Sequence, residues 1–315
     1  MNLTFKDTEE NVLVYAVVGT NSWGSTLYEK LLRGGSVDIK TLKSATDTAV
    51  KNKMFIFDTA ANYGFGKSQK MIGELCPEEI EISAKFTPPK KYKRGQIRAA
   101  LEKTLLDTRR SYAEVYWLHL PLCIEENLTE MAELYKEGKI HNIGISNADI
   151  NEAKHAKNVL HNADIPLFGI QNHYSLLARE WEQNGLFKWC RENNVEFWAW
   201  AVLEEGLLVP PEKQDNSSIL KKFFNGKRKK LTSLYEKSEQ IGKKYDLTAQ
   251  QTAIAFCASK GIVPVCGCRK PYQVEQLFDA VRVKLSETEI KELETAADNT
   301  GVKIMGADMF RFMTK

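Results

Sequence analysis

The chain has 315 residues, of which 43% are hydrophobic and 27% are charged, and 44 Lys+Arg against 41 Asp+Glu give a formal net charge of +3. This ordinary globular composition excludes a disordered chain, a collagen-like repeat and a small disulfide scaffold. A net charge so close to zero also argues against non-specific nucleic-acid binding, which depends on neutralising many phosphates. We therefore expect a globular protein without a nucleic-acid partner.

The apolar runs and the cysteines indicate the compartment. The longest apolar runs, such as 12–18 and 197–203, are much shorter than the roughly 18 residues that a membrane span needs. Lys6 and Asp7 interrupt the N-terminal segment before a signal-peptide core can form. Six cysteines are scattered along the chain, and the closest pair, Cys266 and Cys268, matches no metal-site spacing. We expect a cytoplasmic protein with free thiols, no bound metal and no membrane contact.

Short apolar runs alternate with longer amphipathic runs from one end of the chain to the other. The apolar runs predict eight strands, at 13–18, 54–57, 80–85, 115–119, 140–145, 167–171, 195–200 and 262–267. The amphipathic runs predict helices at 41–52, 67–75, 96–110, 127–137, 149–160, 180–193, 231–245 with 248–260, and 271–280.

The character of the predicted strands indicates how they are arranged. They are brief and apolar with few alternating polar residues, which is typical of parallel strands buried on both faces. Eight strand-then-helix units predict one parallel sheet with helical crossovers. In a chain of 315 residues this favours an α/β fold with a single domain over residues 1–315, a (β/α)8 TIM barrel, rather than two separate domains.

Two segments do not follow this alternation. Residues 204–230 show no clear periodicity and predict a long loop after the seventh strand, which in a compact domain is usually a lid, a binding loop or disordered. The basic cluster at 227–230 is interpreted as a solvated patch. Residues 302–315, rich in Met and Phe, predict a short C-terminal extension.

Polar side chains lie at the ends of three neighbouring predicted strands. Asp58 and Tyr63 follow the second strand, Lys85 ends the third and His119 ends the fourth. Because the carboxyl ends of barrel strands and the loops after them form the active face, we expect these side chains to meet. Each alone has an ordinary structural explanation, such as a turn cap for Asp58, but a buried lysine needs a partner.

Together these residues resemble the catalytic tetrad of the aldo-keto reductase family. The resemblance covers nearly the whole chain, from Gly19 in the first loop to Arg269 after the eighth strand. The matching segments stand in the family's order and at its strand positions: FDTAANYGFG at 57–66, SAKF at 83–86, LHLP at 118–121, GKIHNIGISN at 138–147 and GIQNHYSLL at 169–177. No GxGxxG follows the first strand, so the sequence does not support a Rossmann domain.

The resemblance implies an NADPH-dependent oxidoreductase that reduces aldehydes or ketones to alcohols, or runs the reverse reaction. Hydride transfer builds negative charge on the carbonyl oxygen, which needs a proton donor. In the family's pattern Tyr63 is this general acid, Lys85 favours its phenolate, and Asp58 keeps the lysine charged. His119 donates a hydrogen bond to the carbonyl oxygen. Trp23 lines the substrate pocket beside Tyr63 and His119.

The resemblance also implies a set of contacts to NADP(H). Ser146, Asn147 and Gln171 match residues that bind the nicotinamide carboxamide, and Trp200 matches an aromatic ring that stacks on the nicotinamide. The helix N-terminus after the eighth strand is a natural phosphate site, and the basic side chains there favour NADPH over NADH. The remaining implied contacts come from the first loop and from this helix: Gly19, Thr20, Gly267, Arg269, Lys270, Gln273 and Gln276.

Two segments depart from the family's pattern. The motif of the seventh strand usually runs aromatic-Ser-Pro-Leu-Gly, whereas this chain has Trp200-Ala201-Val202-Leu203-Glu204. The carboxylates of Glu204 and Glu205 are unfavourable beside phosphates unless they point away. The last helix usually carries a Glu-Asn pair, which is replaced here by Gln276-Leu277, so we expect an adenine contact to be lost or moved.

Two other functions remain open. An aldolase-like barrel enzyme would use Lys85 as a Schiff-base nucleophile, but it leaves Tyr63 and Asp58 without a role. A sensor or regulatory subunit would bind NADPH and report the redox state, and the departures from the family's pattern and the basic patch at 227–230 support it. The substrate beyond a small carbonyl compound is also open, as is the oligomeric state, for which a monomer is the default. Residues 305–313 are expected to give the substrate pocket an apolar lining.

Overall fold

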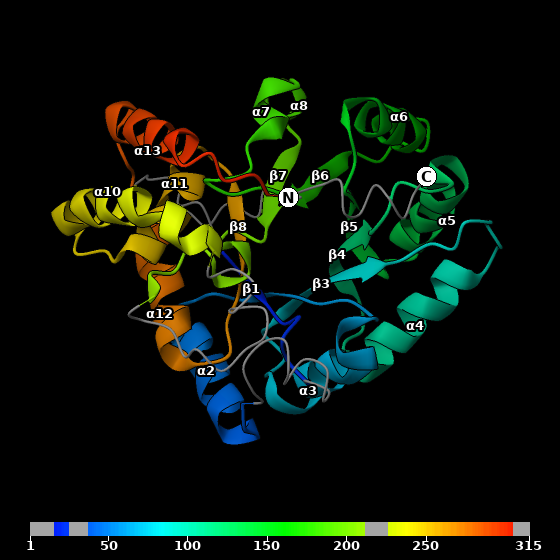
Figure 1. Cartoon of the computed structure of the whole chain (residues 1–315). Coiled ribbons are helices and arrows are strands. Elements are labelled where there is room, and N and C mark those ends of the chain that lie inside the picture. Colours follow the sequence, from blue (N-terminus) through cyan, green and yellow to red (C-terminus); the bar gives the residue numbers. More distant parts are fainter. Residues whose placement is uncertain (1–15, 25–36, 212–225, 305–315) are drawn as a thin grey trace.

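A closed parallel barrel forms the centre of the molecule. The computed structural model describes residues 16–24, 37–211 and 226–304. Within these ranges eight strands pair in chain order, and the first pairs with the last (Figure 1). The strands are β1 (Val17–Gly19), β2 (Ile56–Asp58), β3 (Glu81–Phe86), β4 (Ala113–Leu118), β5 (Ile140–Ser146), β6 (Leu167–His173), β7 (Glu196–Trp200) and β8 (Val263–Gly267). The predicted (β/α)8 TIM barrel is confirmed.

Helices surround the barrel. They are α2 (Ile39–Lys51), α3 (Lys67–Leu75), α4 (Gln96–Thr108), α5 (Ile124–Lys136), α6 (Ile150–His161), α7 (Glu180–Gln183), α8 (Leu186–Glu192), α10 (Thr232–Gly242), α11 (Ala249–Ser259), α12 (Pro271–Val281) and α13 (Glu287–Asn299). On one side of the barrel lie α4 and α5, and on the other lie α10, α11 and α13 (Figure 1). Each predicted helix has a counterpart here within a few residues.

The helices differ from the prediction in two places. Residues 180–193 form two helices instead of one, because Gly185 between α7 and α8 has φ +85° and interrupts the helical backbone. Helix α13 has no counterpart among the predicted helices. Its start carries a capping box, in which the Glu289 carboxylate accepts from the Ser286 N–H at 2.9 Å. This box was a usable signal in the sequence.

The register brings the carboxyl ends of neighbouring strands to one rim. Gly19 of β1 lies opposite both Asp58 of β2 and Gly267 of β8. Asp58 in turn lies opposite Ser83 of β3. A Cβ at Gly19 would lie 3.2 Å from the backbone of Cys266, so the close approach of β1 to β8 leaves little room for a side chain there. Residues far apart in the sequence therefore meet at this rim.

Aromatic rings fill the barrel interior beneath the rim. The ring centroid of Trp117 lies 5.1 Å from that of Trp198 and 6.0 Å from that of Phe168. This indole fits because two neighbouring strands carry a glycine beside it, Gly144 in β5 and Gly169 in β6. A Cβ on Gly144 would lie 2.3 Å from the Trp117 ring. The interior is thus a packed core that supports the rim from below.

The loop after β7 and the C-terminal extension are described in part. The loop begins with the short helix η2 (Glu204–Gly206), and residues 226–230 are helical, so the basic cluster lies on a helix and not in the predicted loop. Residues 212–225 and 305–315, which include the expected pocket lining at 305–313, lie outside the described residues. In the described ranges, no helix combines the length and apolar character of a membrane span. All six cysteines are free thiols.

Candidate active site

Asp58 and Lys85 form a buried ion pair at the rim. Asp58 ends β2 and Lys85 lies in β3, and each is 2% exposed. Lys85 Nζ donates to Oδ1 of the Asp58 carboxylate. The other carboxylate oxygen accepts from Ser83 Oγ at 2.8 Å and from Gln171 Nε2 at 3.0 Å. Donors on β3 and β6 thus satisfy a charge that would otherwise be costly to bury.

Lys85 keeps its positive charge in this position. Burial lowers the pKa of the ammonium, but the Asp58 carboxylate and the Tyr63 oxygen raise it by more, so the pKa lies above its ordinary value of 10.5. Nζ also donates to the Thr59 carbonyl oxygen at 3.3 Å. Lys85 is therefore a fixed cation at neutral pH.

Tyr63 reaches the same ammonium from the turn after β2. The short helix η1 (Tyr63–Gly66) places the Tyr63 hydroxyl 3.3 Å from Lys85 Nζ, and the ammonium lies 5.1 Å from the centre of the ring. Gly64, Phe65 and Gly66 have φ of +56°, +55° and +84°. Such a conformation is unfavourable for Phe65, and strained backbone of this kind concentrates at functional sites. The turn directs the phenol back towards the ion pair.

His119 follows β4 and is held as a neutral imidazole. Its backbone N–H donates to the Phe86 carbonyl oxygen at 2.8 Å, and its Nδ1 lies 2.9 Å from Thr87 Oγ1. Burial, with a further contribution from the Lys85 ammonium, lowers the pKa of His119 from 6.5 to about 3. When Thr87 donates to Nδ1, the single ring proton is on Nε2, and Nε2 is then a hydrogen-bond donor. The structure thus brings all four predicted catalytic residues to one rim.

The predicted carboxamide contacts form a buried chain next to His119. Asn147 Nδ2 donates to the His119 carbonyl oxygen at 2.9 Å and to Ser146 Oγ at 3.1 Å. Ser146 Oγ in turn donates to the Gln171 carbonyl oxygen at 2.6 Å. Asn147 Oδ1 is buried and has no hydrogen-bond partner among the described residues. A buried acceptor is unfavourable unless a donor reaches it, so this position suits an N–H or O–H group of a ligand.

The residues of the first loop join strand ends to one another. Thr20 Oγ1 donates to the Asp58 carbonyl oxygen at 2.8 Å. Trp23 is 1% exposed, and its indole N–H donates to the Cys268 carbonyl oxygen at 2.8 Å. These contacts give both side chains a structural role. A contact of Gly19 or Thr20 with a cofactor, and of Trp23 with a substrate, stays a prediction.

The residues after β8 form the start of α12, where a phosphate is expected. Gln273 Oε1 accepts from the N–H groups of Arg269 at 2.8 Å and of Lys270 at 3.1 Å, so a side chain already caps this helix end. A phosphate here would depend on the basic side chains more than on these two N–H groups. Gln276 is half-buried, and the neighbouring Leu277 is fully buried and serves packing. Phosphate and adenine contacts by these residues stay predictions.

The loop after β7 turns its first carboxylate inward. Glu204 is 6% exposed, and its Oε1 accepts from Ser175 Oγ and lies 2.9 Å from His173 Nε2. The ring of His173 lies against that of Trp200, with 4.7 Å between their centroids. His173 is absent from the predicted site, and its only signal in the sequence is its position two residues after Gln171. The exposed Glu205 follows the buried carboxylate.

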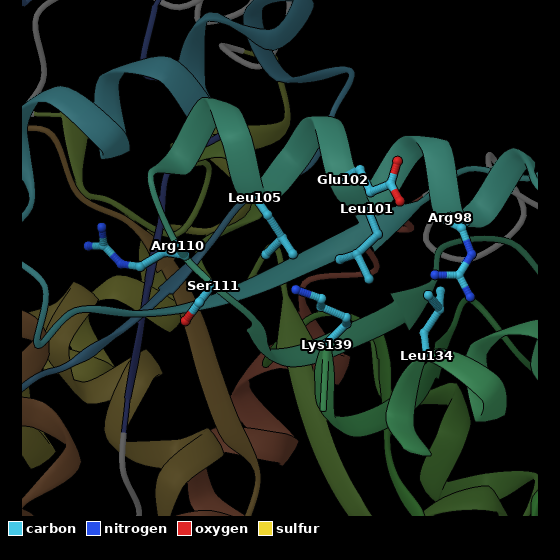
Figure 2. A pocket seen from close by; sticks show the side chains of 8 residues that line it. All are labelled: Arg98, Leu101, Glu102, Leu105, Arg110, Ser111, Leu134 and Lys139. Atoms are coloured by element: carbon cyan, nitrogen blue, oxygen red, sulfur yellow. The ribbon is translucent and has the colours of Figure 1, made fainter. Parts of the chain in front are cut away.

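A separate pocket of about 250 Å³ lies near the amino ends of β4 and β5, away from the rim. Figure 2 shows its lining residues: Arg98, Leu101, Glu102, Leu105, Arg110, Ser111, Leu134 and Lys139. The Arg98 guanidinium pairs with Glu137 at 2.5 and 2.7 Å. Arg110 donates to backbone carbonyl oxygens, including that of Pro77 at 2.6 Å. Both arginines therefore serve the fold, and the rim remains the candidate site.

The fold and the rim define a class of protein: a TIM barrel with a cluster of polar side chains at the carboxyl ends of its strands. Enzymes of this architecture have their active sites at these strand ends. The sequence model of the Aldo/keto reductase family matches residues 17–298. This chain belongs to the aldo/keto reductase family.

Individual relatives share about a quarter of their residues with the chain. Aldo-keto reductase YhdN of Bacillus subtilis is 26% identical over 308 residues, which cover 90% of this chain and 88% of the relative. Aldo-keto reductase yakc [NADP(+)] of Schizosaccharomyces pombe is 27% identical, and the match covers 78% of this chain and 79% of the relative. The crystal structure of the thermostable aldo-keto reductase Tm1743 with the inhibitor epalrestat is 25% identical with a TM-score of 0.70, covering 92% of this chain and 97% of that chain.

Proposed function

We propose that this protein is an NADPH-dependent oxidoreductase that reduces aldehydes or ketones to alcohols. The observation that carries the proposal is the hydrogen-bonded chain from Asp58 through Lys85 to Tyr63, with the neutral His119 at the same rim. Membership of the aldo/keto reductase family supports the oxidoreductase class. The proposed partner is a small carbonyl compound bound over Tyr63.

Tyr63 is the proposed general acid. The chemistry that a bound nicotinamide would supply is a hydride for the carbonyl carbon of the substrate. The carbonyl oxygen then holds the negative charge, and the phenolic proton of Tyr63 moves to it to give the alcohol. The Lys85 ammonium, 3.3 Å away, stabilises the phenolate that remains, and Asp58 holds this ammonium in place. His119 Nε2–H donates to the same oxygen and orients the carbonyl group.

Residues around the rim fit a nicotinamide nucleotide. Asn147 Oδ1 is a buried acceptor without a partner in the described part of the chain, and a carboxamide N–H matches it. Trp200 offers a half-buried aromatic face at the end of β7. The side chains of Arg269 and Lys270 add positive charge that suits the 2′-phosphate of NADPH. A relative named as an NADP(+) enzyme supports this preference.

The charge on Lys85 opposes the Schiff-base alternative. A lysine nucleophile must lose its proton before it attacks a carbonyl group. The pKa of Lys85 lies above 10.5, because the Asp58 carboxylate and the Tyr63 oxygen outweigh the effect of burial. The same ion pair that suits Lys85 to stabilise a phenolate therefore makes it a poor nucleophile.

Replacement of Tyr63 by phenylalanine tests the proposed acid. Tyr63→Phe removes the transferable proton but keeps the ring beside Lys85. We expect kcat for carbonyl reduction to fall on the order of a thousandfold. The dissociation constant for NADPH should stay within about threefold, because the hydroxyl contributes to the chemical step more than to cofactor binding. Loss of NADPH absorbance with a panel of aldehydes measures the rate, and tryptophan quenching measures binding.

A second tyrosine provides the control for this experiment. Tyr112→Phe removes a hydroxyl at the opposite end of the barrel, where it donates to Glu81 at 2.8 Å, and should leave the rate unchanged. Full activity of Tyr63→Phe would refute the role of Tyr63. NADPH binding by the unaltered protein without reduction of any carbonyl in the panel would favour the sensor. Failure to bind either NADPH or NADH would exclude reductase and sensor together.

A further inference from the structure

A buried histidine beside the proposed nicotinamide site has one nitrogen without a partner. His173, at the end of β6, is 2% exposed. Its Nε2 lies 2.9 Å from Glu204 Oε1, whereas its Nδ1 is buried without a hydrogen-bond partner among the described residues. No step of the proposed reaction uses the His173 side chain. A buried polar atom in this state calls for a ligand or another explanation.

The partner of Nε2 determines what Nδ1 can bind. An ionised carboxylate only accepts hydrogen bonds, so the Nε2 of His173 carries the proton that Glu204 accepts. In the neutral ring this leaves Nδ1 with a lone pair, so it needs an O–H or N–H donor. Glu204 is itself fixed, because the same oxygen accepts from the buried Ser175 hydroxyl. The carboxylate thus sets both the tautomer and the position of the ring.

The strand geometry places His173 at the mouth of the barrel. Side chains alternate along a strand, so His173 lies on the same face of β6 as Gln171, whose amide reaches the Asp58 carboxylate at 3.0 Å. His173 lies opposite Trp200 in the register of β6 and β7, and their rings are 4.7 Å apart at an angle of 37°. The unpartnered nitrogen is therefore next to the aromatic ring on which the nicotinamide is proposed to stack.

We propose that Glu204 and His173 form a cofactor-positioning pair, in which His173 Nδ1 accepts a hydrogen bond from a donor on the nicotinamide–ribose half of the bound nucleotide. The donor is a ribose hydroxyl or the carboxamide N–H. This inference rests on the proposed function, because it assumes that the rim binds NADPH. It also explains the departure at the end of the seventh strand, since Glu204 is used to hold His173.

Three variants test the pair without leaving a buried charge unpaired. Glu204→Gln is the reference, because a glutamine oxygen can accept from the same two donors. His173→Phe in this background keeps an aromatic ring against Trp200 and removes Nδ1. His173→Asn in the same background restores an acceptor near the position of Nδ1. Thermal unfolding of each variant, compared with the reference, confirms that it is folded.

Calorimetric titration with NADPH and with adenosine 2′,5′-bisphosphate separates the two halves of the nucleotide. We expect His173→Phe to weaken NADPH binding about tenfold relative to the reference, and His173→Asn to recover most of this loss. Binding of the bisphosphate, which lacks the nicotinamide and its ribose, should be unchanged. The 3-acetylpyridine analogue of NADPH lacks the carboxamide N–H. If the effect of His173→Phe persists with this analogue, the donor is the ribose hydroxyl; if it disappears, the donor is the carboxamide.

An exposed carboxylate far from the rim provides the matched control. Glu102→Gln removes the same charge from a residue that lines the pocket away from the rim, and this variant should bind NADPH like the unaltered protein. Equal NADPH affinity of the reference and the His173→Phe variant would overturn the inference, as would an equal loss of affinity for the bisphosphate. If the unaltered protein does not bind NADPH, the proposed function itself fails, and this outcome is distinct from the other two.

Discussion

Lys85 and His119 are both buried at the rim, yet Lys85 is a cation and His119 is neutral. Burial lowers the pKa of both side chains. The Asp58 carboxylate compensates for this at Lys85, and its pKa ends above the ordinary value. His119 has no such compensation, and the Lys85 cation lowers its pKa further. The Asp58 carboxylate therefore keeps the lysine a cation, whereas burial and this cation keep the histidine neutral.

The neutral state of His119 predicts a pH-dependent stability. The pKa of His119 is lowered from 6.5 to about 3 in the folded protein. Between pH 3 and pH 6.5, His119 is protonated in the unfolded chain but neutral in the folded chain. The free energy of unfolding therefore falls as the pH drops below 6.5. The loss from this group is about 1.4 kcal/mol per pH unit, or about 2 kcal/mol near pH 5. Urea unfolding near pH 7 and near pH 5 measures it.

A variant without the imidazole isolates this contribution. His119→Gln cannot titrate in this range, so the difference in its free energy of unfolding between the two pH values should be smaller by about 2 kcal/mol. His161→Gln, at the exposed end of α6, should keep the pH dependence of the unaltered protein. A His119→Gln variant with an unchanged pH dependence would show that the imidazole is not held neutral.

At the level of strands, two glycines create the space for a tryptophan. Trp117 of β4 is fully buried in the barrel, and its indole N–H donates to Ser83 Oγ at 2.7 Å. Ser83 also donates to the Asp58 carboxylate, so this indole is linked to the candidate active site by hydrogen bonds. Gly144 of β5 leaves the space that the ring occupies. Packing in the barrel interior and geometry at the rim are therefore coupled.

Gly144→Ala should destabilise the protein through overpacking. The added Cβ would lie 2.3 Å from the Trp117 ring, in a core where neither strand can move freely. We expect a loss of about 1–3 kcal/mol in the free energy of unfolding by urea or guanidinium. Gly226→Ala is the control, since a Cβ there meets nothing within 4 Å, and it should change stability by less than about 0.5 kcal/mol. Equal stability of the two variants would contradict the packing argument.

In the whole molecule, one lysine joins three helices on the same side of the barrel. Lys260 follows α11, and its Nζ donates to Glu182 of α7 at 2.7 Å and to Glu294 of α13 at 2.6 Å. Its Nζ also lies 5.0 Å from the centre of the Phe256 ring. The lysine is mostly buried and both carboxylates are partly buried, so solvent screens these pairs less than it screens pairs on the surface.

Lys260→Met tests this junction. Methionine keeps an apolar stem over Phe256 but leaves Glu182 and Glu294 without their shared cation. We expect a loss of about 1–3 kcal/mol in the free energy of unfolding, between the values typical of exposed and buried pairs. Lys188→Met removes a lysine whose Nζ is 3.7 Å from Glu192, in a pair that is largely exposed, and should cost less than about 1 kcal/mol. Equal losses for both variants would refute a special role for Lys260.

Most of the barrel was predictable because its signals are local. Strand and helix periodicity spans a few residues, and it placed the strands and most helices within a few positions of those observed. Residues 13–15 of the first predicted strand lie outside the described residues. The exceptions have physical causes. Gly185 breaks the predicted helix at 180–193 through its backbone conformation. The start of α13 is marked by a capping box, which apolar periodicity does not detect.

The meeting of the proposed catalytic residues at one rim was predictable for a different reason. Asp58, Lys85 and His119 stand at or next to strand ends in the chain, and strand ends meet in any closed barrel of this type. The hydrogen-bond partners of other side chains around the rim could be found only from the tertiary structure. That Gln171 donates to the Asp58 carboxylate, and that the Trp23 indole donates to the Cys268 carbonyl oxygen, follows from register and side-chain packing, which strand periodicity leaves open.

The position of Glu204 is decided by the tertiary structure and not by the local sequence. The sequence alone determined the fold, the family resemblance and the four residues expected at the rim. For Glu204 it indicated only a negative charge in a loop expected beside phosphates. In the folded protein the register of β6 against β7 puts His173 and Ser175 within reach, and the carboxylate turns inward to them. A charge is stabilised by the groups that surround it in space, and those groups come from segments that are distant in the chain.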